Sequence, residues 1–116
     1  MNRHSAEQRG RRAETLAAWW LRLHGWRILA VRARVAGGKV DLVARRGSTL
    51  AFVEVKQRRS AEAAAWSLDH YRLRRVAAAA ERLAARYARP GDIVRIDAIF
   101  IVPRRLPRHL VNVWHG

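Results

Sequence analysis

Hydrophobic residues recur with the period of an α-helix near the start of the chain, from residue 5 to residue 24. Spacings of three and four residues place the bulky members on one side of this helix, which we expect to be its buried face. We expect Ser5 to cap the N-terminus, and Gly25 to follow the last turn in a left-handed conformation. The bulky members of the face are Leu16, Trp19, Trp20 and Leu23.

Glu14 lies on another side of the same helix, among small residues such as Gly10 and Ala17. A face of small residues could pack near a sheet and bring Glu14 with it. The simpler explanation is an ordinary helical ion pair, for example with Arg11 three residues earlier. The spacing alone slightly favours the ion pair.

A second helix is predicted over residues 70–88, where apolar residues again recur at helical spacing. Arginines occupy most of the remaining positions, and the Pro90-Gly91 pair is expected to end the helix. Its predicted buried stripe consists of Val76, Ala79, Ala80, Leu83 and Tyr87.

Shorter apolar segments predict strands. Residues 26–32 (WRILAVR) and 93–102 (IVRIDAIFIV) are two of them, and the second is expected to lie centrally in a sheet. Residues 110–114 (LVNVW) predict a short edge strand. Residues 33–38 (ARVAGG) predict a loop with a tight turn, and residues 60–69 predict a loop with a helical turn around Trp66.

Asp97 is the one acid within the apolar segment 93–102. A buried carboxylate needs a partner, so we expect Asp97 to bind Arg95 or a group on the first helix. The five histidines have no metal-ligand spacing with acids and are expected at the surface or at element boundaries.

Residues 39–56 (KVDLVARRGSTLAFVEVK) predict a β-hairpin with acids at positions where apolar residues are expected. If residues 46–49 form a four-residue loop, Arg45 pairs with Leu50 and Asp41 lies opposite Glu54. Opposed side chains have Cβ atoms about 4.5–5.5 Å apart.

Side chains alternate along a strand, so Lys56 shares the face of Glu54. The carboxylates of Asp41 and Glu54 repel each other unless a cation or a shared proton lies between them. Mg²⁺ prefers oxygen ligands of this kind, and a neighbouring lysine can stabilise the charge that builds on a phosphate. The hairpin therefore predicts a site for metal-dependent hydrolysis of phosphodiesters.

The net charge is +15, from 24 Lys and Arg against 9 Asp and Glu. Such an imbalance favours a polyanionic partner, DNA or RNA, over an anionic membrane surface. Lys39 and Lys56 are the only lysines, and the chain has no cysteine, which excludes disulfides and thiolate metal sites. No apolar run is long enough to cross a bilayer and the N-terminus is polar, so we expect a cytoplasmic protein that does not bind membranes.

At 116 residues the chain is long enough for one hydrophobic core and too short for two. We therefore expect residues 1–116 to form a single domain.

Five motifs run through most of the chain: RRAETLAAWWL, HGWRILAVRAR, GGKVDLVARRG, LAFVEVKQR and VRIDAIFI. They resemble the YraN family of small bacterial proteins, which are similar to Holliday-junction resolvases and restriction-endonuclease-like nucleases. The resemblance covers residues 9–102 and implies an α/β fold with a restriction-endonuclease-like αβββαβ core, a mixed central sheet flanked by helices. It also implies a Mg²⁺ (or Mn²⁺) site with Glu14, Asp41, Glu54 and Lys56, supported by Gln57.

The chain departs from the family pattern at three positions. Lys39 stands where the family usually has Glu, Arg72 where it has Lys, and Ala13 where it has Gly. Lys39 lies on the Asp41 face by parity, where it would pair with Asp41 or contact a phosphate.

Three functions follow from these patterns. The first is a metal-dependent endonuclease acting on structured or branched DNA, for which a homodimer would suit a two-fold symmetric substrate. The second is a non-catalytic nucleic-acid-binding protein on the same fold, and the third is a basic protein that binds an acidic protein or a ribosomal partner. The residues expected to contact nucleic acid are Arg34, Lys39, Arg58, Arg59, Arg72 and Arg75.

Overall fold

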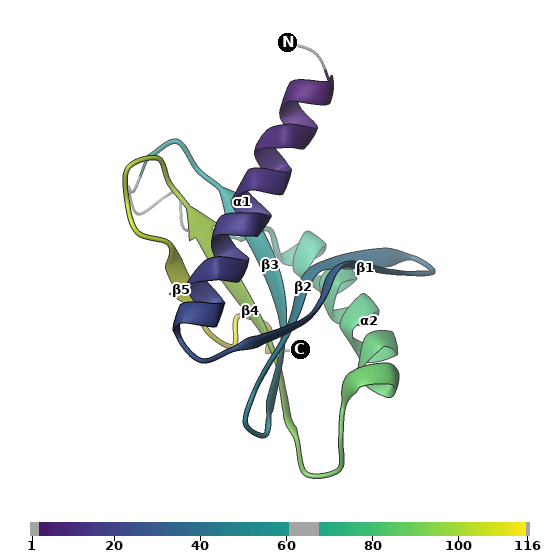
Figure 1. Ribbon diagram of the computed structural model, residues 1–116. Coiled ribbons are helices and arrows are strands. Elements are labelled where there is room, and N and C mark those ends of the chain that lie inside the picture. Colours follow the sequence, from purple (N-terminus) through teal and green to yellow (C-terminus); the bar gives the residue numbers. More distant parts are fainter. Residues whose placement is uncertain (1–2, 61–67, 116) are drawn as a thin grey trace.

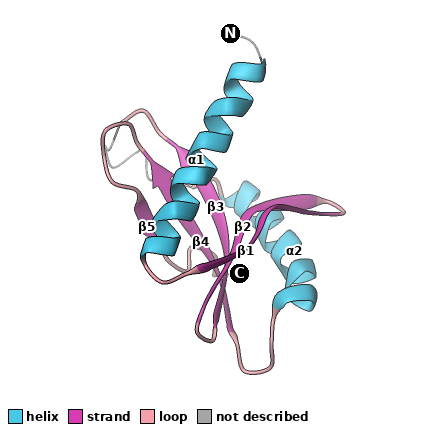
Figure 2. Ribbon diagram, viewed as in Figure 1, coloured by secondary structure: helices cyan, strands magenta, loops and turns pink. Residues whose placement is uncertain are grey.

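A mixed β-sheet lies at the centre of the structure, a computed structural model that describes residues 3–60 and 68–115, without the side chains of residues 3–7 and 9. Within these residues the elements follow the predicted αβββαβ order, with one short strand added at the end (Figures 1 and 2). They are α1 (Arg3–Leu23), β1 (Arg27–Val35), β2 (Gly38–Arg46), β3 (Thr49–Gln57), α2 (His70–Tyr87), β4 (Ile93–Ile101) and β5 (Arg108–Leu110).

The described strands are ordered β1-β2-β3-β4-β5 across the sheet. β3 and β4 are parallel, and the other neighbouring pairs are antiparallel. The parallel pair requires a crossover, which α2 provides, whereas β2 and β3 need only a tight turn. Helix α1 packs on one face of the sheet and α2 on the other (Figure 1).

Only one residue of the predicted face of α1, Trp20, packs against the core, and the face that meets the sheet is formed mainly by small residues together with Leu21. Leu16, Trp19 and Leu23 are 53%, 57% and 77% exposed. Small side chains let the helix axis come close to the sheet, which leaves the bulky residues on the outer side. Helix α1 contributes Ala17, Ala18 and Leu21 to the core, where they meet Trp26, Leu42, Ala44, Ala51, Val53 and Ile99.

The N-terminal boundary of α1 also differs from the prediction. The helix begins at Arg3, so Ser5 lies within its first turn and does not cap it. The C-terminal prediction is confirmed, because Gly25 has φ 87° and its backbone N–H donates to the carbonyl of Arg22.

Helix α2 buries the predicted stripe on the opposite face. Leu83 is almost fully buried, whereas Tyr87 is only half-buried. Asp69 caps the helix, since its carboxylate accepts a hydrogen bond from the backbone N–H of Tyr71 at 2.9 Å. This second core combines Val76, Ala79, Ala80 and Leu83 with Val40, Val43, Leu50, Phe52 and Ile96.

The turns of the sheet are shorter than predicted. The loop expected at residues 33–38 is wrong, because β1 continues to Val35 and β2 begins at Gly38. The turn before β3 is also tighter, since Arg46 still pairs with Thr49. The pairing of Arg45 with Leu50 is nevertheless as predicted, because removing one residue from each side of a loop leaves the register unchanged.

Arg45 links the turn between β2 and β3 to the end of α2. It is buried, and its guanidinium donates to the carbonyl of Tyr87 and to both carboxylate oxygens of Asp92. The hydrogen bond from Arg45 lowers the pKa of Asp92 to about 2. The predicted loop around Trp66 lies outside the described residues.

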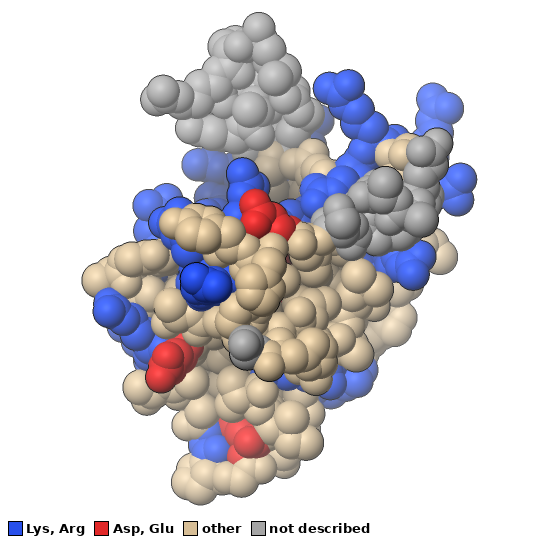
Figure 3. Space-filling view, turned by 180° about the vertical axis from the view of Figure 1, so that it is seen from behind, with Lys and Arg blue, Asp and Glu red and all other residues tan. Residues whose placement is uncertain are grey.

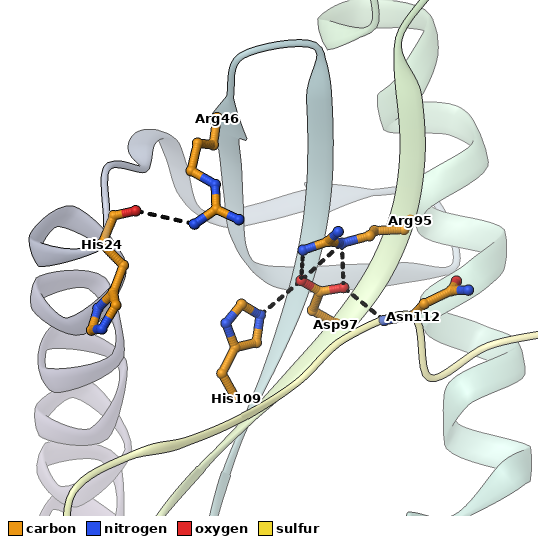
Figure 4. A network of polar contacts seen from close by, with 6 residues as sticks. All are labelled: His24, Arg46, Arg95, Asp97, His109 and Asn112. Atoms are coloured by element: carbon orange, nitrogen blue, oxygen red, sulfur yellow. Dashed lines mark hydrogen bonds and ion pairs between the residues drawn. The ribbon is translucent and has the colours of Figure 1, made fainter.

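Asp97 on β4 is fully buried and holds the C-terminal segment on the sheet (Figure 4). The expected partner Arg95 is confirmed at 3.0 Å, and two further donors come from the segment after β4. They are His109 Nε2 at 2.8 Å and the backbone N–H of Asn112 at 2.9 Å. Burial alone would raise the pKa of Asp97, but these hydrogen bonds outweigh it and hold the pKa below its ordinary value.

The edge strand lies at Arg108–Leu110 instead of residues 110–114. The difference has a physical reason, because His109 pairs with Ile99 in the ladder and turns its side chain to Asp97. His109 is half-buried within this strand, so the position expected for it, at the surface or at an element boundary, is wrong. No described helix is long and apolar enough to cross a membrane.

We predict that Asp97→Ala lowers the free energy of unfolding by about 3 kcal/mol, because it leaves the half-buried partners Arg95 and His109 without their acceptor. Urea denaturation followed by circular dichroism measures this change. Glu81→Ala, at an exposed position on α2, is the control and should change stability by less than about 0.5 kcal/mol. Equal effects of the two substitutions would contradict the structural role of Asp97.

Candidate functional site

Helix α1 and strands β2 and β3 enclose a pocket of about 240 Å³ that gathers the predicted site residues. The hairpin supplies acids and a lysine, and α1 supplies a further acid through its small-residue face. The pocket is lined by Gly10, Ala13, Glu14, Lys39, Asp41, Glu54, Val55, Lys56 and Gln57.

Asp41 is buried at the inner side of this pocket. Its Oδ2 accepts a hydrogen bond of 2.8 Å from the backbone N–H of Val55, just beyond the last ladder pair of β2 and β3. Lys39 Nζ donates to Oδ1 at 3.0 Å, which confirms the ion pair expected from parity. Both oxygens of Asp41 therefore have donors, and the carboxylate is held in one orientation.

Glu54 lies beside Asp41, where its negative charge is less well compensated than that of Asp41. Burial, the negative charge of Asp41 and a hydrogen bond with Asp41 raise the pKa of Glu54 to about 7. Lys56 Nζ lies 3.4 Å from Glu54 Oε1 and offsets the rise only in part. Glu54 is therefore partly protonated near neutral pH.

Glu14 reaches the pocket from α1, and its partner is Arg32 instead of Arg11. Arg32 Nε donates to Glu14 Oε1 at 2.6 Å. Arg32 has φ 51°, a left-handed conformation that costs a non-glycine residue about 1–2 kcal/mol. Helical spacing could not reveal this contact, because it joins α1 to an irregular position in β1.

The paired carboxylates of Asp41 and Glu54 are the residues that could hold a divalent cation, since a cation would relieve their mutual repulsion. Such a site would need water to complete the coordination, as Mg²⁺ sites often do. The described residues contain no group of three or more His, Cys, Asp or Glu that could hold a metal ion. Glu14 is engaged by Arg32 and is not brought into such a group.

The basic residues predicted to contact nucleic acid divide between two further pockets. Arg34, Lys39, Arg72 and Arg75 line a pocket of about 540 Å³ beside Glu54 and Lys56. The other predicted pair lies elsewhere, since Arg58 and Arg59 line a pocket with Arg12 and Gln57. Figure 3 shows Lys and Arg side chains along much of the visible rim and only small patches of acidic side chains.

The structural comparison shows which fold the chain adopts. A solved structure of Hjc, a Holliday junction resolvase from Archaeoglobus fulgidus, is similar to this chain with a TM-score of 0.58 and 20% sequence identity. The match covers 86% of this chain and 73% of that chain. The fold is therefore α/β and restriction-endonuclease-like, which confirms the expectation from sequence.

The chain belongs to the family described as "Uncharacterised protein family UPF0102", also called YraN, whose model matches residues 13–101. A UPF0102 protein of Sphingopyxis alaskensis is 66% identical over 98% of both chains. A second, from Rhizorhabdus wittichii, is 59% identical over 100% of this chain and 99% of its own. The resemblance drawn from the sequence motifs is confirmed.

We predict that the stability of the chain falls as the pH rises from about 4.5 to 7. The pKa of Glu54 is raised from its ordinary value of 4.5 to about 7, so in this range the folded chain holds a proton that the unfolded chain has lost. Glu54→Gln removes this titration. The free energy of unfolding of the variant, relative to that of the wild type, should therefore be higher at pH 8 than at pH 4.5 by on the order of 2 kcal/mol.

Urea denaturation at the two pH values measures the difference. Glu81→Gln, which changes an exposed glutamate on α2, is the matched control and should follow the wild type. Parallel pH profiles of the wild type and Glu54→Gln would contradict the raised pKa.

Proposed function

We propose that this protein is a metal-dependent endonuclease that hydrolyses phosphodiester bonds in structured or branched DNA. The observation that carries the proposal is the pairing of Asp41 and Glu54 in one pocket beside Lys56, with the pKa of Glu54 raised to about 7. Perturbed carboxylates in a pocket are typical of functional sites. The similarity to a resolvase supports the proposal at the level of the fold.

The chemistry of the pocket suits phosphodiester hydrolysis. A bound Mg²⁺ or Mn²⁺ would supply charge relief at the phosphate and an activated water. Asp41 and Glu54 would hold the ion, and the Val55 N–H would keep Asp41 oriented toward it. Lys56, on the same face as Glu54, is placed to stabilise negative charge on the phosphate.

A carboxyl group whose pKa is near 7 can accept or donate a proton near neutral pH. Glu54 has this property because of its burial and its proximity to Asp41. Without an ion Glu54 can therefore exchange a proton, and a bound cation would take the place of that proton at the carboxylate. Gln57 lines the same pocket from the end of β3 and supports the site there.

The arginines beside the pocket suit a nucleic-acid substrate. Arg34, Arg72 and Arg75 line the adjoining pocket, and the whole chain carries a net charge of +15. Phosphate contacts of this kind predict binding that weakens steeply with salt. A homodimer would suit a branched substrate with two-fold symmetry.

One observation favours a second function, nucleic-acid binding without catalysis. Lys39 already pairs with Asp41 at 3.0 Å, and Arg32 pairs with Glu14 at 2.6 Å. Both cations lie where they would oppose a divalent ion. The Lys39 side chain is 49% exposed, however, so solvent can receive its ammonium group when it leaves Asp41.

We predict that the purified chain cleaves a branched or flapped DNA with Mg²⁺ or Mn²⁺, and that Glu54→Gln lowers the rate at least about 100-fold. Gel electrophoresis of end-labelled DNA measures the cleavage. The control Glu81→Gln should cleave at the wild-type rate. If neither metal gives cleavage above the level of Glu54→Gln, the endonuclease proposal is wrong and binding without catalysis remains.

We predict that Lys39→Ala binds Mn²⁺ on the order of tenfold more tightly than the wild type, because removing the ammonium group frees Asp41 Oδ1 and removes a repulsive charge. Titration calorimetry without DNA measures the affinity. Arg86→Ala removes the same charge at an exposed position near the end of α2 and should leave the affinity unchanged. Equal affinities of Lys39→Ala and the wild type would contradict competition by Lys39.

A further inference from the structure

The pocket of about 540 Å³ adjoins the acid pair and is open to a ligand of its own. It lies between the end of β1, the start of β2, the end of β3 and the first turns of α2. The two pockets adjoin each other, because Lys39, Glu54 and Lys56 line both of them.

Apolar side chains line one part of this pocket. Leu73 and Val76 of α2 are buried, and Val35 at the end of β1 is half-buried. Gly38 brings the hairpin close to α2, since a Cβ there would lie 3.4 Å from the Ala79 Cβ and 3.5 Å from the Arg75 carbonyl oxygen. One part of the pocket therefore offers an apolar surface that an apolar group of a ligand could contact.

Cations line the other part. Arg34 comes from β1, and Arg72 and Arg75 come from successive turns of α2. Asp69 also lines the pocket, but its carboxylate already accepts the backbone N–H of Tyr71 and caps α2. An apolar surface beside arginines and lysines matches a ligand with a flat apolar group and an anionic group.

The size of the pocket limits that ligand. Sites for small molecules have volumes of about 300–1,000 Å³, a range that includes this pocket. A DNA double helix, whose major groove alone is about 12 Å wide, is too large to enter it. A single nucleotide displaced from a strand has both the required size and the required chemistry, and arginine planes commonly stack on unpaired bases.

We propose that this pocket receives one unpaired nucleotide of a DNA strand, with its base against Val35, Leu73 and Val76 and its phosphate at Arg72 and Arg75. The inference rests on the proposed function, because it places the neighbouring phosphodiester at the acid pair. It also gives a physical reason for a preference for branched over fully paired DNA, since unpairing costs least where a base is already unpaired.

Fluorescence anisotropy in EDTA, where no cleavage occurs, tests the proposal with three labelled duplexes. One is fully paired, one has a single extra nucleotide, and one has an extra abasic nucleotide that keeps the phosphate and lacks the base. We expect the duplex with the extra base to bind on the order of tenfold more tightly than the other two. A deoxynucleoside monophosphate is then added as competitor. A pocket that serves free nucleotides would bind this competitor, and the protein would show no preference among the three duplexes.

Two variants locate the effect. Val35→Trp fills the apolar part and should remove the preference for the extra base, while the affinity for paired DNA stays within about twofold. Arg72→Ala should weaken binding of the duplex with the extra base more than binding of the paired duplex. Arg86→Ala removes an equal charge outside the pocket and should leave the preference intact, and circular dichroism shows whether each variant is folded.

Equal binding of the base and abasic duplexes by the wild type would overturn the proposal, as would an intact preference in both folded pocket variants. Failure of the proposed function gives a different result. A preference for the extra base without metal-dependent cleavage would support the nucleotide pocket and contradict the endonuclease proposal. Cleavage without the preference would sustain the nuclease and reject the pocket.

Discussion

The close pairing of Asp41 and Glu54 is the constraint on which the surrounding structure depends. Two carboxylates can share a pocket only if donors and cations compensate their repulsion, and β2 and β3 supply these groups. The Val55 N–H and Lys39 hold Asp41, and Lys56 lies beside Glu54. Helix α1 closes the pocket, and its small residues permit the necessary approach.

Asp97 shows how the same sheet treats a carboxylate that serves stability. It lies on β4, next to the strand that carries Glu54, and is fully buried. Its partners Arg95, His109 and Asn112 keep its pKa low, whereas the pKa of Glu54 rises to about 7 beside Asp41. Asp97 thus holds the C-terminal segment on the sheet, whereas Glu54 remains available to bind an ion or a proton.

Sequence reasoning succeeded where the signal was local. The register of the β2–β3 hairpin was correct although its loop was shorter than expected, because symmetric shortening preserves the pairing. The predicted face of α1 was correct only at Trp20, because the helical spacing of large apolar residues such as Trp19 does not reveal that small residues meet the sheet. The contacts of Glu14 with Arg32 and of Asp97 with His109 depend on a left-handed residue and on a short edge strand, neither of which leaves a periodic signal.

The order of the strands also has a consequence for how the site assembles. The acid pair belongs to a hairpin whose strands are joined by a tight turn, and local pairing of this kind forms within microseconds. The arginine wall of the larger pocket lies on α2, within the crossover between the parallel strands β3 and β4, whose pairing requires closure of a much longer loop. We therefore expect the carboxylates to come together early in folding, before the helix that completes their surroundings has docked.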